Sequence, residues 1–154
     1  MNKEDQIMGA FRELLNKWVS LNKFNMEKSL KEYKSSEIHC VDYIKKNDDS
    51  NVTRLAEAFY MTGGAISKLT KRLINKGVLE SYRRVDNKKE IYFRLTEKGE
   101  DIYKIHDGLH EEFKERDKAV YENITEQEFD NMLAFAENYI KHLDAEIKKS
   151  GVEI

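Results

Sequence analysis

The chain has 154 residues, of which 40% are hydrophobic and 36% are charged, and it contains no proline. This composition is typical of a mostly helical protein of about one domain. No stretch approaches 18 consecutive apolar residues, the N-terminal segment lacks the apolar core of a signal peptide, and a single cysteine excludes an intramolecular disulfide framework. We therefore expect a cytoplasmic protein rather than a membrane or secreted one.

Two helices are predicted in the first third of the chain. The first spans roughly Lys3 to Lys31, because large apolar side chains recur along it at intervals of three and four residues. The second begins at Ser35 or Ser36 and runs to about Lys46, where a polar string ends the pattern. The apolar face of the first helix is made by Ile7, Phe11, Leu14, Trp18 and Leu21.

A short helix and a longer one follow, separated by a tight turn near Tyr60. Asn51 or Thr53 is expected to cap the short helix, and the longer one spans Thr62 to Asn75. Gly77 lies just past the last periodic residue, where a glycine readily adopts the left-handed conformation that ends many helices. The buried face of the longer helix is predicted to consist of Ile66, Leu69 and Leu73.

After Gly77 the apolar pattern changes to a period of two, which predicts strands at Val78–Arg83 and Glu90–Leu95. The loop 84–89 between them carries an Asp-Asn turn signal and predicts a β-hairpin. Thr96 then caps a long helix, and Thr125 opens a last helix with a capping-box sequence. The apolar faces predicted for these two helices are Ile102, Ile105, Leu109, Phe113 and Val120, and Phe129, Leu133, Ala136, Ile140, Leu143 and Ile147.

Charge is unevenly distributed along the chain. Residues 51–99 contain 11 Lys/Arg against 5 Asp/Glu, whereas the net charge of the whole chain is −2. A basic middle segment between acidic ends indicates a polyanionic partner, although a solvated basic face accounts for the charge alone equally well.

The order of elements favours the polyanion. It consists of a short helix, a tight turn, a second helix and a basic hairpin, an arrangement that is typical of duplex-DNA-binding motifs. In these motifs the N-terminal residues of the second helix contact the base edges. Small residues at the helix tip allow close approach, and the exposed N–H groups there bind phosphate. The hairpin tip is expected to touch the minor groove or the backbone. The residues predicted to contact DNA are Thr62, Gly63, Gly64, Ser67, Lys68, Lys71, Arg72, Arg83, Asn87, Lys88 and Lys89.

Several sequence marks occur together between residues 51 and 99. They are Leu55-Ala56, the helix from Ser67 to Leu73 before Lys76-Gly77, Asp86 in the hairpin, and the run Leu95 to Gly99. On these marks, and on the helices to either side, the chain resembles the MarR family of winged helix-turn-helix regulators.

The resemblance implies a fold that is mainly α with a small β-hairpin wing. It implies a single domain, 1–154, with the winged helix-turn-helix lobe at 35–99 and helical dimerisation regions at 1–34 and 100–154. It also implies a homodimer that binds a pseudo-palindromic operator, usually as a repressor. Lys88 stands where the family wing usually carries arginine, which fits a narrow minor groove better than lysine does.

The resemblance further implies an effector between the helical region and the lobe, and the residues leave two kinds open. Zinc or another divalent metal would be held by His106 and His110, at i and i+4 on one helix, together with His39, since zinc-responsive members use similarly placed histidines. An organic effector would instead occupy an apolar pocket with His39 as its polar anchor. That pocket is predicted to be lined by Leu14, Trp18, Ile38, His39 and Tyr43.

The sequence contains few motifs that indicate another class of function. It contains no glycine-rich phosphate loop, nucleophile motif or His-Glu-x-x-His signature, so we expect no enzymatic activity and no required cofactor. Cys40 neighbours the buried stripe of its helix without an evident cation beside it, which predicts an inert thiol. The alternative to a DNA-binding regulator is a winged-helix protein-interaction module without specific DNA binding.

Overall fold

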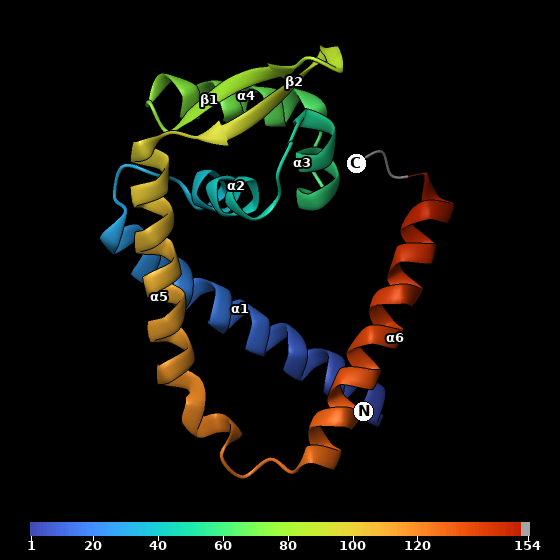
Figure 1. Ribbon diagram of the computed structural model, residues 1–154. Coiled ribbons are helices and arrows are strands. Elements are labelled where there is room, and N and C mark those ends of the chain that lie inside the picture. Colours follow the sequence, from blue (N-terminus) through green and yellow to red (C-terminus); the bar gives the residue numbers. More distant parts are fainter. Residues whose placement is uncertain (152–154) are drawn as a thin grey trace.

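The computed structural model describes residues 1–151 as six helices and one two-stranded antiparallel hairpin (Figure 1). The predicted fold class, mainly α with a small β-hairpin wing, is confirmed. The expected domain runs to residue 154, and residues 152–154 lie outside the described ones. Within the described part, no helix has both the length and the apolar character needed to cross a membrane. The elements are α1 (Lys3–Ser29), α2 (Ser35–Lys46), α3 (Val52–Phe59), α4 (Gly63–Asn75), β1 (Leu79–Arg84), β2 (Asn87–Leu95), α5 (Glu97–Tyr121) and α6 (Glu126–Ser150).

Side-chain caps set most of the helix starts. The side-chain oxygens of Asn51, Thr62 and Thr96 each accept a hydrogen bond from the backbone N–H of the residue three positions later, at 2.9, 3.1 and 3.2 Å. Each bond satisfies one of the N–H groups that a helix start leaves without a partner. Thr125 opens α6 with the predicted capping box, and Gly77 follows α4 with a φ of +75°. Local sequence therefore determines where these helices begin and end.

The hydrophobic core lies in the lobe formed by α2, α3, α4 and the hairpin, with the first half of α5 packed against it. The predicted buried face of α4 is confirmed, because Ile66, Leu69 and Leu73 are at most 2% exposed. The lobe thus buries its apolar side chains without help from another molecule. The other elements contribute Ile38, Val41, Ile44, Leu55, Val78, Leu79, Phe93 and Ile102.

One carboxylate is buried at the edge of this core. Glu37 is 1% exposed, accepts the backbone N–H of Lys34 at 3.0 Å and forms an ion pair with Lys76 at 3.0 Å. The ammonium of Lys76 also lies 5.0 Å from the ring centroid of Tyr33. A buried charge is tolerated when it is paired and hydrogen-bonded. Lys76 therefore ties the end of α4 to the start of α2.

The hairpin is longer, and its turn shorter, than the sequence predicted. Arg84 at the end of β1 pairs with Asn87 at the start of β2, so the turn consists of Val85 and Asp86 instead of six residues. The guanidinium of Arg84 donates two hydrogen bonds of 2.8 Å to the carboxylate of Asp86, which closes the turn. The polar composition of 84–89 therefore reflects exposure of the tip and not an unpaired loop.

The first turn of α5 packs closely on the hairpin. Gly99 is buried there, and a β-carbon at this position would collide with the carbonyl oxygen of Val78. The hydroxyl of Thr96 lies within hydrogen-bond distance of the carbonyl oxygens of Gly77 and Val78. This close approach explains why the sequence carries a glycine in an otherwise regular helix.

The three helices outside the lobe, α1, α5 and α6, are called the outer helices below, and they are built differently from the lobe. Among the described residues of α6 none is buried, and its predicted apolar face is exposed or half-buried. On α5, Ile102 and Phe113 are buried as predicted, whereas Ile105 and Val120 are exposed. Figure 1 shows α5 and α6 diverging from the turn that joins them. The exposed apolar residues of α1 include Ile7, Phe11, Leu14, Leu15, Trp18 and Val19.

Candidate nucleic-acid interface

The N-terminal end of α4 is an exposed helix tip without bulky side chains. The helix begins after Thr62, and both Gly63 and Gly64 are exposed. A β-carbon built on Gly64 would meet nothing within 4 Å, and one on Gly63 would meet Val52 at an ordinary 3.7 Å. Each glycine in a helix costs about 1 kcal/mol relative to alanine. Since the lobe itself does not require glycine here, the open space is available to a molecule outside the chain.

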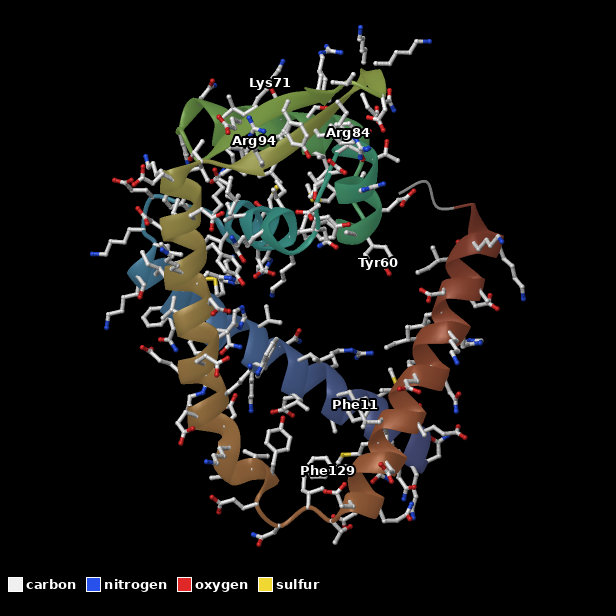
Figure 2. The ribbon with its side chains drawn as sticks, in the orientation of Figure 1. Phe11, Tyr60, Lys71, Arg84, Arg94 and Phe129 are labelled. Carbon is white, nitrogen blue, oxygen red and sulfur yellow. The ribbon has the colours of Figure 1, made fainter. Side chains whose placement is uncertain are left out.

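Three cations on α4 stand on the side away from the core. Lys68, Lys71 and Arg72 are exposed, and none of them belongs to an ion pair within the described part of the chain. Figure 2 shows Lys71 at the outer surface of the lobe, beside the hairpin. Ser67 is half-buried on the same helix. The structure therefore brings the predicted contacts of α4 together on one accessible surface.

The predicted wing residues are exposed, but they lie in paired strands. Asn87, Lys88 and Lys89 form the start of β2, and Arg83 lies near the end of β1. The guanidinium of Arg83 donates a hydrogen bond to the carbonyl oxygen of Lys88 across the hairpin. Successive side chains of a strand point to opposite faces, so Lys88 and Lys89 flank the ribbon instead of extending from one tip. The sequence placed all three β2 residues in a loop, and that placement is wrong.

A group of wing residues absent from the sequence prediction connects the hairpin to the lobe. Tyr82 and Tyr92 lie opposite each other in the ladder, with ring centroids 5.6 Å apart. Arg94 lies 5.0 Å over the ring of Tyr82, and Arg84 lies 5.9 Å over that of Tyr92. Both Tyr82 and Arg84 also donate a hydrogen bond to Asp49. The alternation of aromatic and cationic residues along the two strands was the available signal.

The predicted metal-binding histidines are close but do not form a complete site. His106 is 2% exposed, its Nε2 lies 2.9 Å from Nε2 of His110, and its ring lies 6.3 Å from that of His39. Its Nδ1 lies 3.4 Å from Asp42. No group of three or more histidine, cysteine, aspartate or glutamate side chains within residues 1–151 is arranged to hold a metal ion. The His106–His110 pair thus forms as the helical spacing predicts, whereas His39 does not complete a three-ligand site.

Burial controls the protonation of these histidines. Burial, and then the neighbouring His110, lower the pKa of His106 to about 4. Burial also lowers the pKa of His39, although the Asp42 carboxylate opposes that shift. His106 is therefore a neutral imidazole at pH 7, and its tautomer decides whether its Nε2 donates to or accepts from the facing ring nitrogen of His110.

The predicted effector-pocket residues are only partly brought together. Ile38 belongs to the lobe core, Tyr43 packs edge-on against Phe59, and Leu14 is exposed. Trp18 and His39 do line one small pocket of about 80 Å³ between α1, α2 and α5. Ile38 is outside this pocket because the apolar stripe of α2 faces the core, and of the five predicted residues Trp18 and His39 line it. The full lining is Trp18, Val19, Asn22, Lys23, Met26, Ser35, His39 and His110.

One buried polar group in this pocket was missed from the sequence. Asn22 is 7% exposed, and its side-chain oxygen accepts a hydrogen bond from Arg116 at 2.9 Å. Its amide nitrogen is buried without a hydrogen-bond partner in the structure. An unpaired buried donor is costly, and such groups call for a physical explanation. A polar residue inside the apolar pattern of α1 was the available signal.

Cys40 lies in the core at the other side of α2. It is fully buried, and burial, with the Glu37 carboxylate second, raises the pKa of its thiol to about 12. The reactive form of cysteine is the thiolate. Both observations agree with the predicted inert thiol.

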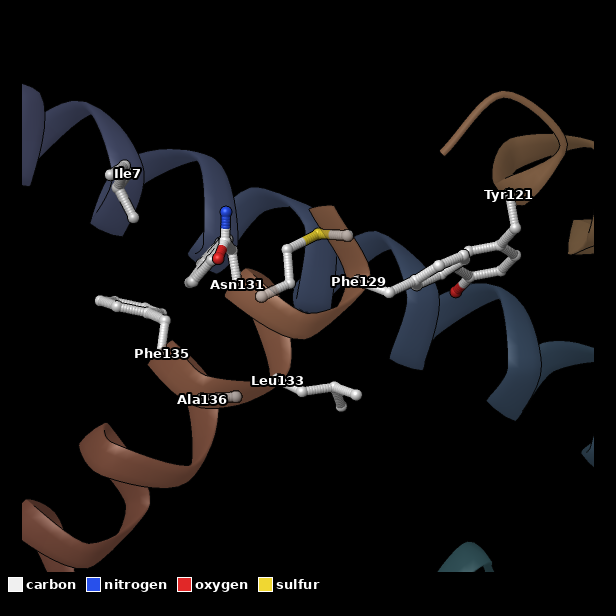
Figure 3. A pocket seen from close by; sticks show the side chains of 9 residues that line it. Ile7, Tyr121, Phe129, Asn131, Leu133, Phe135 and Ala136 are labelled. Carbon is white, nitrogen blue, oxygen red and sulfur yellow. The ribbon is translucent and has the colours of Figure 1, made fainter. Parts of the chain in front are cut away.

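A long apolar groove lies at the opposite end of the molecule. Figure 3 shows side chains of α1, of the end of α5 and of α6 around it. Its volume is about 550 Å³, and Phe11 of α1 meets Phe135 of α6 with ring centroids 5.9 Å apart. The groove contains no titratable side chain apart from Tyr121, so its surface offers apolar contact and little chemistry.

Comparisons with known proteins agree with this arrangement. A family model described as the MarR family matches residues 34–91. Two HTH-type transcriptional regulators of Bacillus subtilis are similar in sequence. YhjH is 32% identical over 119 residues, which make up 77% of this chain and 66% of that protein. PchR is 32% identical over 112 residues, or 71% of this chain and 64% of that protein, so the aligned stretch spans slightly less than two thirds of either relative.

A solved structure supports the fold over nearly the whole chain. Streptococcus pneumoniae FabT in complex with DNA is similar with a TM-score of 0.79, covering 92% of this chain and 98% of that chain, at 22% identity. At this identity the likeness shows the fold, which is a winged helix-turn-helix lobe carried on long flanking helices.

Proposed function

This chain belongs to the MarR family of winged helix-turn-helix proteins, and from that premise we propose that it is a transcriptional regulator. It binds a pseudo-palindromic DNA operator in the cytoplasm as a homodimer and represses by occluding the site. The observation that carries the proposal is the surface of α4. A helix tip bare of side chains, with Lys68, Lys71 and Arg72 exposed behind it, fits the floor and phosphates of a major groove.

The homodimer is supported by the apolar surface of the outer helices. Large apolar side chains are exposed along both α1 and α6, and extended exposed apolar surface often marks an interaction site. In a two-fold interface the same patch meets itself, so a second copy would cover the exposed faces of α1 and α6 at once. Two recognition helices would then lie about one turn of DNA apart.

A small organic acid is the effector that the pocket between α1, α2 and α5 supports best. The lining is mainly apolar, with Trp18 and Met26 among its side chains, and it also includes Asn22, Lys23, His39 and His110. The amide nitrogen of Asn22 is buried without a partner, and a carboxylate that reached it would supply the missing acceptor. Because the pocket measures about 80 Å³, it holds a head group, and the remainder of the ligand would extend outward.

Regulation by zinc or another divalent ion is the second candidate, favoured by the contact between His106 and His110. Thermal unfolding separates the two effectors, with zinc in one series and benzoate or dodecanoate in the other. Stabilisation by zinc that disappears in the double variant His106→Ala, His110→Ala supports the metal. Stabilisation by an acid that disappears in Asn22→Leu supports the organic ligand.

The function is tested first by selecting duplexes from a random DNA pool with the purified protein. Recovery of a pseudo-palindrome, bound with a steep dependence on salt, supports a dimeric regulator, because each phosphate contact releases counterions. Lys68→Ala and Lys71→Ala should each weaken binding by ~1–3 kcal/mol at a base contact, or reduce the salt slope by about one at a phosphate contact. Lys141→Ala on α6 is the matched control and should leave affinity unchanged.

The winged-helix protein-interaction module is the alternative. It predicts that no sequence is enriched and that Lys68→Ala and Lys71→Ala change neither affinity nor salt slope. That result would remove the proposed role of α4.

A further inference from the structure

Asp49 is an aspartate in a left-handed backbone conformation, at the junction between α2 and α3. Its φ is 55°, a left-handed conformation that few residues other than glycine, asparagine and aspartate adopt. One carboxylate oxygen accepts the hydroxyl of Tyr82 at 2.6 Å, and the other accepts the guanidinium of Arg84. Both donors belong to the outer half of β1. An aspartate in the loop before α3 therefore binds the wing at two points.

Arg84 carries this connection to the hairpin turn. The same guanidinium that reaches Asp49 also makes the two hydrogen bonds to Asp86. The bond from Arg84 lowers the pKa of Asp86, so that carboxylate is ionised at neutral pH. An arginine held by two carboxylates is neutralised locally. Although Arg84 is a cation on the wing, its position makes it an internal brace and not a DNA contact.

The neighbours of Asp49 attach the wing to the same short segment. The carbonyl oxygen of Ser50 accepts the N–H of Phe93 at 2.9 Å, and the amide of Asn51 donates to Glu90 at 3.2 Å. Asn51 is at the same time the cap of α3. Residues 49–51 thus hold the wing while they start the helix that precedes α4. These three residues therefore contribute to the angle between the wing and the recognition helix, together with the packing of α4 and α5 on the hairpin.

We propose that Asp49 is a positioning residue that fixes the wing, so that Lys88 and Lys89 reach the DNA backbone when α4 lies in the major groove. The inference rests on the proposed function. Asp49 touches no DNA in this scheme and acts through Tyr82 and Arg84. Without its carboxylate, the hairpin keeps its own pairing and the bonds to Ser50 and Asn51, but its outer half loses the two contacts that fix its direction relative to the lobe.

Asp49→Asn tests the inference with little disturbance of the backbone, because asparagine also adopts the left-handed conformation readily. The substitution removes the negative charge that holds Arg84. It also replaces one of the two acceptor oxygens with an amide NH₂ group, which cannot accept a hydrogen bond. Asp48→Asn is the matched control, since it makes the same change of charge one residue earlier, on an exposed side chain. Thermal unfolding verifies that both variants fold.

A double-mutant cycle on DNA binding separates positioning from general destabilisation. In the wild-type background, Asp49→Asn should lower affinity for the selected duplex roughly tenfold and reduce the salt slope by about one to two. In the background of Lys88→Ala with Lys89→Ala, the same change should cost less than about twofold, because the wing contacts are already gone. An equal loss in both backgrounds, or an equal loss from Asp48→Asn, would overturn the inference.

Amide hydrogen exchange of the free protein gives a second test of the wing's attachment, and this test does not depend on DNA binding. Asp49→Asn should accelerate exchange at the amides of residues 82–90 while leaving α4 protected. Unchanged exchange would show that Asp49 does not anchor the wing. If the wild-type protein enriched no duplex, the proposed function would fail, and this measurement alone would decide whether residues 49–51 hold the hairpin.

Discussion

The lobe and the outer helices both carry large apolar side chains at regular intervals, yet the lobe buries them and the outer helices expose many of them. In the lobe the apolar faces of α2, α3 and α4 meet one another, and Leu55, Ile66 and Leu73 are fully buried. In α6 the equivalent face stays open, with Leu133 59% and Ile140 58% exposed. The lobe covers its apolar faces within one chain, whereas the outer helices leave theirs open, as the proposed homodimer requires. Stability and assembly are therefore located in different parts of the molecule.

This difference predicts that substitutions in the two regions fail in different assays. A lobe variant should unfold more easily at any protein concentration. A variant of the outer helices should keep its fold and lose its association. The four predictions below test that separation, beginning with the largest expected effect.

Ile140→Glu and Leu133→Glu should abolish dimerisation. Each buried Leu or Ile contributes about 1.5–3 kcal/mol, and two-fold symmetry doubles this, so each change should weaken association by about 3–6 kcal/mol. Sedimentation should show monomers at concentrations where the wild type is dimeric, with affinity for the two-half-site duplex reduced in parallel.

The matched control is Ala145→Glu, which lies on the opposite side of α6 at helical periodicity. It should leave the oligomeric state unchanged. A monomeric wild type, or equal behaviour of all three variants, would contradict the division between lobe and outer helices.

Lys76→Ala should destabilise the lobe by about 3 kcal/mol, because it leaves the Glu37 carboxylate buried without its partner. Urea denaturation measures the effect, and the sedimentation of the folded protein should not change. Lys45→Ala provides the contrast, since it removes the exposed Lys45–Glu100 pair and should cost far less than the loss of the buried pair. Similar costs for both would mean that burial of Glu37 does not matter.

Lowering the pH should destabilise the protein through protonation of His106, which lies between α5 and α2. In the unfolded chain a histidine takes up its proton near pH 6.5, whereas buried His106 does so near pH 4. Between these values the unfolded state binds more protons, so stability falls as pH decreases. At about 1.4 kcal/mol per pH unit, the loss reaches ~2 kcal/mol at pH 5.

Urea denaturation at pH 7, 6 and 5 measures this loss. His106→Leu should reduce it and leave the part due to His39, whose pKa burial also lowers, whereas the exposed His142→Gln should retain it in full. A wild type whose stability is constant over this range would show that His106 does not titrate as its burial requires.

Gly64→Ala should have the smallest effect, and the two readouts should move in opposite directions. The lobe should gain about 0.5–1 kcal/mol, since alanine favours a helix and its methyl group meets nothing. Affinity for DNA should fall, because the methyl group occupies the space at the helix tip. Gly108→Ala in α5 also adds a methyl group in open space, and it should change neither affinity nor salt slope.

The sequence allowed prediction of features that depend on neighbours a few residues apart. The caps at Asn51, Thr96 and Thr125 and the buried face of α4 are of this kind, because each depends on residues within one or two helical turns. Periodicity also identified the apolar face of α6. It could not show whether that face is covered within the chain, because amphipathic patterns look the same in both cases.

What could not be predicted depends on residues that the fold brings together. Tyr82 and Asp49 are 33 residues apart, and Lys76 and Glu37 are 39 apart. Ile38 was placed in an effector pocket because its helix presents two apolar sides, and packing selected the core side. The hairpin turn was predicted too long since the Arg84–Asp86 contact depends on geometry that composition does not reveal.

The buried thiol of Cys40 has a practical consequence for measuring how the two halves of the proposed dimer move. Because the single cysteine is fully buried and ionises near pH 12, labelling reagents at neutral pH will not modify it. A cysteine introduced at the wing, as Lys88→Cys, would therefore carry the only label on each copy. In a homodimer the distance between the two spin labels then reports the wing-to-wing distance, which can be measured with and without DNA or a candidate effector.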